Sequence, residues 1–282
     1  MRLKDPDLSS KIDALQSVLH SWSRVVIAFS GGCDSALLVK AACGVLGAEH
    51  VLAVTSQSAS LARREIPEIE QFVKDHGIRH RWVDTREMEN QDYVRNPKDR
   101  CFFCKTELYR QMIPVAREWN AQAILNGINR EDLGDWRPGI EAAKAFLIRS
   151  PLMEAGFVKK DVRDYAKMLG LETWDKPAAP CLASRFAYGQ EISEEGLRRV
   201  EAAEDRVRGF GFRIVRVRCL AGSVARIEVA PEELSKLMEH PGKENLLGQI
   251  RSLGFNRAEI DPEGYRMGKM NSESGLSGQA GQ

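Results

Sequence analysis

Apolar and polar positions follow two different periods along the first 170 residues. Short apolar runs of strand length are separated by longer segments in which apolar residues recur every three or four positions. Strands are predicted at 25–29, 50–55, 79–84 and 121–126. Helices are predicted at 8–21, 35–46, 61–76, 104–119 and 158–169. Strands that alternate with helices of this length indicate βαβ units and a parallel sheet, the α/β class.

Beyond about residue 185 the pattern changes to that of a smaller α+β domain. An amphipathic helix is predicted at 192–207, where Ser193 is a suitable N-cap. Strands at 213–220, 225–230 and 258–260 and helices at 231–239 and 243–253 are expected to follow. We therefore expect domains at 1–185 and 186–270. The polar, Gly-rich residues 271–282 are expected to be a disordered tail.

The turn SGGCDS, residues 30–35, joins the first predicted strand to the first long helix. A helix N-terminus carries unpaired N–H groups and the positive end of the dipole, so it attracts anions. Gly31 and Gly32 let the backbone curl around a phosphate, and Ser30 and Ser35 add hydroxyl donors. The turn holds no Lys, which excludes the Walker-type loop GxxxxGK[ST].

A nucleotide is expected at the carboxyl edge of the sheet, where open α/β sheets bind their ligands. Asp34 would repel a phosphate unless a cation such as Mg²⁺ lay between them. Thr55 ends the second predicted strand, and Gly127 would let a nucleotide approach the loop NGINREDLGDWRPG closely. Three polar residues of this loop could hold metal or substrate, namely Asp132, Asp135 and Arg137. The alternative is that the loop is an exposed acidic turn.

Three of the six cysteines have a pattern that suggests chemistry. Cys101 and Cys104 form a CxxC at the start of a predicted helix, where the dipole favours a thiolate, and Cys181 lies in a Pro-flanked loop. Three thiolates with an open fourth position suit a [4Fe–4S] cluster with one exchangeable iron. Two alternatives stay open: Cys181 as a sulfur-carrying nucleophile beside a redox or structural CxxC, and zinc or unrelated buried thiols.

Arginines of the second domain are candidates for binding an anion. Arg216 and Arg218 alternate along a predicted strand, so they face the same side. Together with Arg185 they could form a pocket for phosphate or carboxylate, which the planar guanidinium matches. The alternative is a basic strand face exposed to solvent.

Composition narrows the class of protein. The net charge of +1 gives no global argument for nucleic acid or an acidic membrane. No apolar run approaches the roughly 18 residues of a membrane span, and no secretory pattern opens the sequence. We expect a cytoplasmic protein without a membrane or nucleic-acid partner, whose cysteines are thiols, metal ligands or catalysts rather than disulfides.

The turn SGGCDS after a first strand resembles the PP-loop of ATP pyrophosphatases, which adenylate a substrate and release pyrophosphate. Further segments extend the resemblance to the LarE family of ATP-dependent sulfur transferases over nearly the whole chain: NGINREDLGDWRPG, KPAAPCLASRFAYG, RIVRVR and GYRMGKMN. The resemblance implies a parallel-sheet PP-loop domain, of the adenine nucleotide alpha hydrolase type, followed by a smaller α+β domain.

The resemblance also implies an activity. The family adenylates a carboxylate of a pyridinium-3,5-dicarboxylate mononucleotide and converts it to a thiocarboxylate for the nickel-pincer cofactor. ATP and Mg²⁺ are expected at residues 30–35, with catalytic Asp34 and contacts from Thr55, Gly127 and Arg185. The substrate is expected to contact Ser184, Arg216 and Arg218. A homo-oligomer, with a hexamer as one form, is implied as well.

The source of the sulfur differs within the family. In some members a cysteine that matches Cys181 gives up its own sulfur and becomes dehydroalanine. In others, cysteines that match Cys101, Cys104 and Cys181 resemble a [4Fe–4S] site that carries an extra sulfide from a sulfur donor. This sequence has all three and resembles the cluster-dependent type, with Cys181 as the catalytic thiol.

Two other functions remain compatible with these motifs. One is a PP-loop enzyme that thiolates tRNA or another small molecule, and the other is a nucleotide-binding iron–sulfur sensor without turnover. The near-neutral second domain, which lacks a long basic stripe, argues against tRNA. Pyrophosphate release that depends on the pyridinium substrate would separate both from the main prediction.

Overall fold

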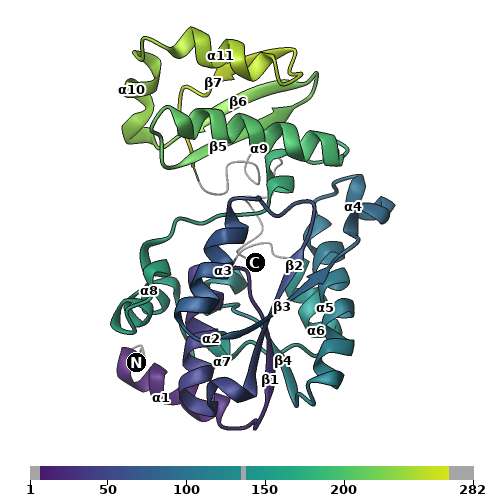
Figure 1. The fold of residues 1–282 in the computed structure, drawn as a ribbon, viewed down its shortest axis with the longest axis vertical. Helices are drawn as coiled ribbons and strands as arrows, with labels where there is room; N and C mark the ends of the chain where they lie inside the picture. The colour runs from purple at the N-terminus through teal and green to yellow at the C-terminus, as the bar shows by residue number, and fades with distance from the viewer. Residues whose placement is uncertain (1–6, 135–137, 267–282) are drawn as a thin grey trace, which may run out of the picture. The chain divides into compact units, whose positions relative to one another are not determined.

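The computed structural model describes residues 7–134 and 138–266 (Figure 1). The chain divides into two compact units, which we call the first and second unit. The first holds Met1–Glu87 and Cys101–Ala179, and the second holds Met88–Arg100 and Pro180–Gln282. The sequence did not predict that residues 88–100 would join the second unit. The predicted tail at 271–282 lies outside the described residues.

A parallel sheet forms the centre of the first unit. Its four strands, in the part of the chain that the structure describes, have the order β3-β2-β1-β4. They are β1 (Val25–Ala28), β2 (Val51–Gln57), β3 (Arg79–Asp84) and β4 (Ala123–Leu125). In the register, Val25 of β1 lies between Val51 and Ala123. All pairs are parallel, so the predicted α/β class is confirmed.

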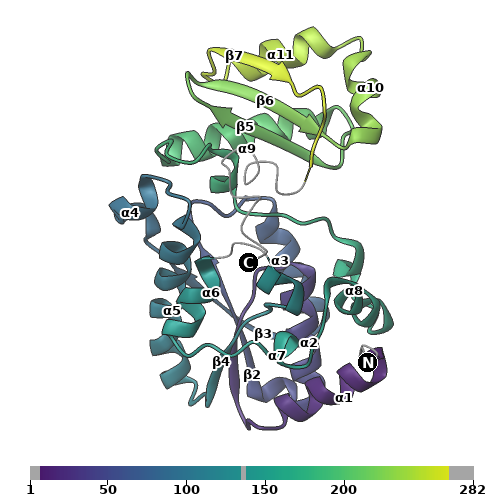
Figure 2. The ribbon, with the colours of Figure 1, turned by 180° about the vertical axis from the view of Figure 1, so that it is seen from behind.

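Two hydrophobic cores cover the two faces of this sheet. Because successive residues of a strand point to opposite faces, Val25 and Ile27 join one core while Val26 joins the other. One face is covered by α1 (Leu8–Leu19), α2 (Cys33–Leu46), α3 (Glu65–Asp75), α7 (Pro151–Glu154) and α8 (Lys159–Met168). The other is covered by α5 (Arg100–Glu118) and α6 (Pro138–Ala145), as Figure 2 shows.

Some helix boundaries differ from the prediction for identifiable reasons. Helix α3 begins at Glu65 rather than at residue 61. Pro67 then lies in the first turn, where its missing N–H is tolerated, whereas it would interrupt a helix that had begun four residues earlier. Helix α5 begins at Arg100, so both cysteines of the CxxC lie inside the helix. The short helices α4 (Gln91–Val94), α6 and α7 were not predicted.

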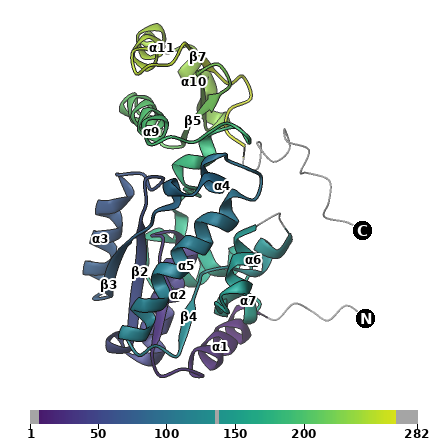
Figure 3. The ribbon, with the colours of Figure 1, turned by 90° about the vertical axis from the view of Figure 1, so that its right-hand side faces the viewer.

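The second unit contains a mixed sheet of order β5-β6-β7 within its described residues. Strands β5 (Val215–Leu220) and β6 (Val224–Val229) are antiparallel, and β7 (Arg257–Ile260) is parallel to β6. Helices α10 (Leu234–Met238) and α11 (Lys243–Arg251) form the crossover between β6 and β7. Helix α9 (Glu194–Gly209) packs on β5 and against α11, and Figure 3 shows α9 and α11 on one side of the sheet. The predicted C-terminal α+β unit is confirmed.

Among the described helices, none combines the length and the apolar character needed to cross a bilayer.

Candidate functional site

The turn that begins at Ser30 has the geometry of an anion-binding loop. Gly31 has a φ of +70°, which L side chains rarely adopt, and a Cβ there would lie 2.6 Å from Cγ1 of Ile69. Gly32 is the N-cap of α2 and provides no side-chain hydrogen bond to the first turn. The N-terminal N–H groups of α2 therefore have no capping side chain, which is the arrangement that suits a phosphate.

The two serines of the turn have different positions. Ser35 is buried, accepts a hydrogen bond from the Ser30 amide (3.2 Å) and donates one to the Gly32 carbonyl (3.0 Å). Ser30 is exposed, and its hydroxyl lies 3.2 Å from that of Ser35. Ser35 thus holds the shape of the turn, while Ser30 presents a hydroxyl at its surface.

Asp34, in the first turn of α2, is held by two partners from distant parts of the chain. Its Oδ2 lies 2.5 Å from Nζ of Lys159, the first residue of α8, and its Oδ1 accepts a hydrogen bond from Asn129 Nδ2 (3.2 Å). The Asp34 side chain is 26% exposed. A partly exposed carboxylate that is oriented at both oxygens is suited to a cation or to a reacting group. No pattern in the sequence pointed to Lys159, which lies 125 positions away.

A second lysine supports the turn from another side. Lys176 donates to the Gly31 carbonyl (3.3 Å) and forms ion pairs with Glu65 (2.8 Å) and Glu68 (2.7 Å). Burial by itself would lower the pKa of Lys176, but the two carboxylates outweigh it and raise that pKa above the ordinary value. Lys176 therefore stays charged while it fixes the backbone of the turn. Sequence reasoning missed this residue as well.

Gly127 is required because its loop approaches the backbone of the turn closely, whereas the sequence predicted a close approach of a nucleotide. A Cβ at this position would lie 2.9 Å from the Ser35 amide nitrogen and 3.0 Å from the Asp34 carbonyl carbon. The loop after β4 thus packs directly on the backbone of the turn. In the same loop, Asp132 accepts a hydrogen bond from the Asn129 amide (3.0 Å). Asp135 and Arg137 lie outside the described residues.

Thr55 lies inside β2 rather than at its end, because the strand continues to Gln57. Its hydroxyl donates to the Phe29 carbonyl (2.8 Å) and lies 2.8 Å from Nε2 of His80, and the residue is 3% exposed. Burial lowers the pKa of His80. Thr55 therefore supports the segment directly before the turn, and a direct contact with a nucleotide stays a prediction.

The three predicted functional cysteines belong to different units. Cys101 and Cys104, three positions apart on α5, share a helix face in the first unit, whereas Cys181 precedes a 3₁₀ turn (Leu182–Arg185) in the second. Cys101 and Cys181 are exposed and Cys104 is half-buried. Across residues 7–134 and 138–266, no three His, Cys, Asp or Glu side chains come together as a metal site.

The other three cysteines are less suited to chemistry. Burial raises the pKa of the thiols of Cys33 and Cys219, and it raises the pKa of Cys43 to about 11. A higher thiol pKa leaves less of the reactive thiolate at neutral pH. All six cysteines lie in the described residues, and each has a free thiol there.

Arg185 is fully buried, and its guanidinium is used within the second unit. It forms an ion pair with Glu204 (2.7 Å from Nε) and donates to the Cys181 carbonyl (3.1 Å) and the Ser184 hydroxyl (3.0 Å). Burial raises the pKa of Glu204, but Arg185 and Arg208 more than offset it and hold that pKa at about 2. These contacts assign Arg185 to the Cys181 loop, and a contact of Arg185 with a nucleotide stays a prediction.

Arg216 and Arg218 are buried, so the alternative of a solvent-exposed basic strand face is wrong. Arg218 forms an ion pair with Glu228 (3.0 Å) and donates to the Ser184 carbonyl (2.9 Å). The Arg216 guanidinium lies 5.0 Å from the ring centre of Tyr265, and burial together with nearby Arg185 lowers its pKa to about 10. A cation that is desolvated and close to like charge is stabilised by a bound anion.

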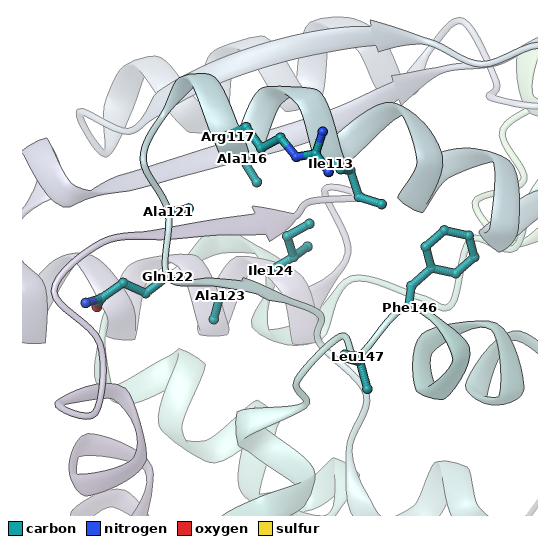
Figure 4. Close-up of a pocket in the computed structure, with 9 residues that line it drawn as sticks. All are labelled: Ile113, Ala116, Arg117, Ala121, Gln122, Ala123, Ile124, Phe146 and Leu147. Atoms are coloured by element: carbon teal, nitrogen blue, oxygen red, sulfur yellow. The ribbon is translucent and has the colours of Figure 1, made fainter.

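The pocket shown in Figure 4 is separate from the turn. It has a volume of about 230 Å³ and lies between the C-terminal half of α5, the start of β4 and the segment Phe146–Leu147. The amino end of β4 lies at the opposite edge of the parallel sheet from the turn after β1. This pocket is therefore not the expected nucleotide site.

Comparison with known proteins decides the family. No family model matches the sequence. The chain is 33% identical to the pyridinium-3,5-bisthiocarboxylic acid mononucleotide synthase of Lactiplantibacillus plantarum, over 94% of this chain and 95% of that protein. It belongs to the LarE-like family. The chain is also 42% identical to the uncharacterized protein slr1717 of Synechocystis, over 94% of this chain and 98% of that protein.

A more distant relative supports the assignment of the LarE-like chain to the PP-loop superfamily. A glutamine-hydrolysing GMP synthase chain of Thermoplasma acidophilum is 26% identical over 71% of this chain and 70% of that protein. The parallel sheet, the turn at residues 30–35 and these relatives together make the chain an ATP-using PP-loop enzyme of the LarE type.

Proposed function

We propose that this LarE-like chain is an ATP-dependent sulfur transferase. It adenylates a carboxylate of a pyridinium-3,5-dicarboxylate mononucleotide and converts that group to a thiocarboxylate, a step of nickel-pincer cofactor biosynthesis. The observation that carries the proposal is the match to the Lactiplantibacillus plantarum synthase along 94% of this chain, which spans both units. The anion-binding turn and the exposed Cys181 supply the two chemical functions that the reaction needs.

ATP would bind through its phosphates at the turn. The N-terminal N–H groups of α2 and the exposed Ser30 hydroxyl are hydrogen-bond donors, and Lys159 adds positive charge. The partly exposed carboxylate of Asp34 fits Mg²⁺, which prefers oxygen ligands and usually binds through one or two carboxylates and substrate phosphates. Bound Mg²⁺ would neutralise charge on the phosphates. Lys159 and Asn129 orient Asp34 for this role.

The reaction would have two displacements. A carboxylate oxygen of the substrate attacks the α-phosphorus, the bond from that phosphorus to the β-bridging oxygen breaks, and pyrophosphate leaves. Sulfide then attacks the acyl carbon, and AMP leaves with the electron pair of the C–O bond. Arg216 and Arg218, desolvated and positively charged, would hold an anionic group of the substrate together with Ser184.

We propose further that Cys101, Cys104 and Cys181 hold a [4Fe–4S] cluster. The donor set suits it because thiolates are the ligands of such clusters, and because Cys101 and Cys181 are exposed and Cys104 is half-buried. When bound, the cluster would supply an open iron site able to carry sulfide. The alternative is that Cys181 gives up its own sulfur and becomes dehydroalanine.

The test is a set of anaerobic assays on the full chain with ATP, Mg²⁺ and the pyridinium dicarboxylate mononucleotide. We expect pyrophosphate release that depends on this substrate, and a thiocarboxylate product identified by its mass. Reconstituted protein should contain about four irons per chain. Each single change of Cys101, Cys104 or Cys181 to Ala should abolish the cluster and thiolation but not adenylation.

The outcomes separate the parts of the proposal. Pyrophosphate release that does not depend on the pyridinium substrate would overturn the proposed function. Protein that stays iron-free and loses about 34 Da from Cys181 after one turnover, as H₂S, would replace the cluster by the cysteine-derived route. We also propose that the chain forms a homo-oligomer such as a hexamer, which light scattering would test. The cytoplasmic location stays a prediction.

A further inference from the structure

The loop that carries Cys181 has its carbonyl groups bound by buried side chains. Residues 180–187 form a short 3₁₀ turn, Leu182–Arg185, and one isolated bridge from Phe186 to Cys219. Most carbonyls of the loop are therefore not bound within a helix or sheet. Such carbonyls usually bind water at the surface of a protein. Here they accept hydrogen bonds from a layer of side chains beneath the loop, while the Cys181 thiol is exposed.

Arg185 holds the first part of this loop. Its Nη1 donates to the Pro180 carbonyl (2.5 Å) and to the Cys181 carbonyl (3.1 Å). Its Nε and Nη2 bind both carboxylate oxygens of Glu204, which is itself 0% exposed. The guanidinium plane is therefore fixed on one edge by Glu204 and presents its other edge to the backbone of Cys181.

Two other buried arginines hold the next carbonyls. Arg100, from the segment 88–100, donates to the Ala183 carbonyl (3.0 Å). Arg218 of β5 donates to the Ser184 carbonyl (2.9 Å) while Glu228 binds its other edge. In addition, the fully buried Asn96 donates to the Ala187 carbonyl (2.8 Å). Residues from three separate parts of the second unit thus converge on one loop.

We propose that Arg100, Arg185 and Arg218 are positioning residues that fix the Cys181 thiol for sulfur transfer. This inference rests on the proposed function, because it assigns a purpose to the placement of Cys181. By these contacts the arginines act on the backbone of the loop and do not touch the thiol. Arg218 also belongs to the proposed substrate site, so only Arg100 and Arg185 are varied in the test. Arginine suits the task because its planar fork carries several donors, so one side chain binds a counter-ion and a carbonyl at once.

The experiment compares wild-type protein with Arg185→Lys. Lysine keeps the charge but has a single nitrogen, so it cannot bind Glu204 at two points and also reach the Pro180 and Cys181 carbonyls. Arg100→Gln is the second variant, in case Arg185→Lys does not fold. The matched control is Arg198→Lys on the exposed face of α9, where Arg198 pairs with Glu194. Hydrogen exchange of residues 180–187, pyrophosphate release and thiocarboxylate formation are measured for each.

We expect faster hydrogen exchange confined to 180–187 and a fall in the kcat of sulfur transfer on the order of a hundredfold, as for a reacting group misplaced by about 1 Å. Pyrophosphate release and the KM for ATP should stay within about twofold of wild type, because adenylation does not use Cys181. The Arg198→Lys control should match wild type in all three measurements.

Three results would overturn the inference: unchanged exchange in both variants, unchanged sulfur transfer despite faster exchange, or an equal fall of both half-reactions. Unchanged exchange would mean that the arginines do not hold the loop. Unchanged sulfur transfer despite faster exchange would mean that the loop does not matter for transfer. An equal fall of both half-reactions would indicate a general structural role. Wild-type protein that makes no thiocarboxylate would overturn the proposed function and the purpose assigned to the loop. The exchange data would then still decide whether these arginines hold it.

Discussion

The turn at residues 30–35 and the loop around Cys181 both depend on ion pairs, but the two sets of charges differ in exposure. At the turn, the side chains of Lys159 and Asp34 are 36% and 26% exposed. At the Cys181 loop, the side chains of Arg185 and Glu204 are both 0% exposed. The first pair is accessible to solvent and to a ligand, whereas the second is enclosed by protein.

This difference in exposure suits the first ion pair to ligand binding and the second to positioning the protein backbone. A partly exposed ion pair contributes little to stability, on the order of 1 kcal/mol or less, so an incoming phosphate or metal ion can rearrange it. Removing one partner of a buried pair leaves an uncompensated charge in the interior and is strongly destabilising. The turn therefore has charges that a ligand can recruit. The charges beneath Cys181 hold the backbone of the protein itself.

The largest effect is expected from Asp34→Ala at the turn. Removing the carboxylate that would hold Mg²⁺ should lower pyrophosphate release on the order of a thousandfold, the upper range for loss of one electrostatic group in an active site. The free energy of unfolding should change by less than about 1 kcal/mol, because the pair with Lys159 is partly exposed. Pyrophosphate assays and urea unfolding measure the two quantities.

Asp164→Ala is the matched control for this change, since Asp164 pairs with Lys160 on the exposed surface of α8. It should leave pyrophosphate release unchanged. Unaltered turnover in Asp34→Ala would remove Asp34 from the catalytic site. A large loss of stability in that variant would instead erase the contrast between the two regions.

Glu204→Gln should have the opposite signature, a large loss of stability. The change removes the counter-charge of Arg185 and Arg208, so we expect the free energy of unfolding to fall by about 3–5 kcal/mol at neutral pH. Glu194→Gln, on the exposed start of α9, is the matched control and should leave stability nearly unchanged. A small loss at Glu204 would mean that the buried network is not what holds this region.

The pH dependence gives a second check on Glu204. Its pKa is lowered from the ordinary value of 4.5 to about 2 in the folded protein, so the ionised form is favoured by folding. The stabilisation is then fully present above pH 4.5 and is lost as the pH falls toward 2. The stability difference between wild type and Glu204→Gln should therefore be constant near neutrality and shrink in acid. A difference that grows in acid would contradict the assignment.

The two regions also differ in how much of them the sequence predicts. The sheet and the turn follow from local patterns, because strand, glycines and helix are contiguous from residue 25 to 46. Gly31 was predicted for a local reason, a backbone that must curl, and its φ of +70° agrees with that reason. Features of this kind can be predicted from the sequence because they depend on neighbouring residues in the chain and not on the segments that pack against them.

Contacts between distant segments could not be predicted in this way. Lys159 reaches Asp34 across 125 positions, and Lys176 reaches Gly31 across 145. Arg216 and Arg218 were predicted as anion-binding candidates, but their burial was not predicted, for another reason. Charged residues are usually exposed, so a solvent-exposed basic strand face remained an alternative to an anion pocket for Arg216 and Arg218. Their burial depends on Glu228 and on a loop from elsewhere in the chain.

The smallest of the expected effects concerns Gly127, which joins the turn to the rest of the first unit. In Gly127→Ala the new methyl group would lie 2.9 Å from the Ser35 amide nitrogen, a backbone atom that cannot rotate away. The N-terminus of α2 must then shift, at a cost of about 1–3 kcal/mol in the free energy of unfolding. The same shift should raise the KM for ATP several-fold, because the displaced N–H groups are the expected phosphate donors.

Gly44→Ala in the middle of α2 is the matched control, since a Cβ there has no neighbour within 4 Å. It should leave the KM for ATP unchanged and stabilise the protein by about 0.5–1 kcal/mol, because alanine is the better helix former. Urea unfolding and ATP saturation curves of the two variants give the comparison. If Gly127→Ala loses stability but keeps the wild-type KM, the methyl group is accommodated by the loop after β4. The N-terminus of α2 then has not moved, and the turn is held as rigidly as the loop that carries Cys181.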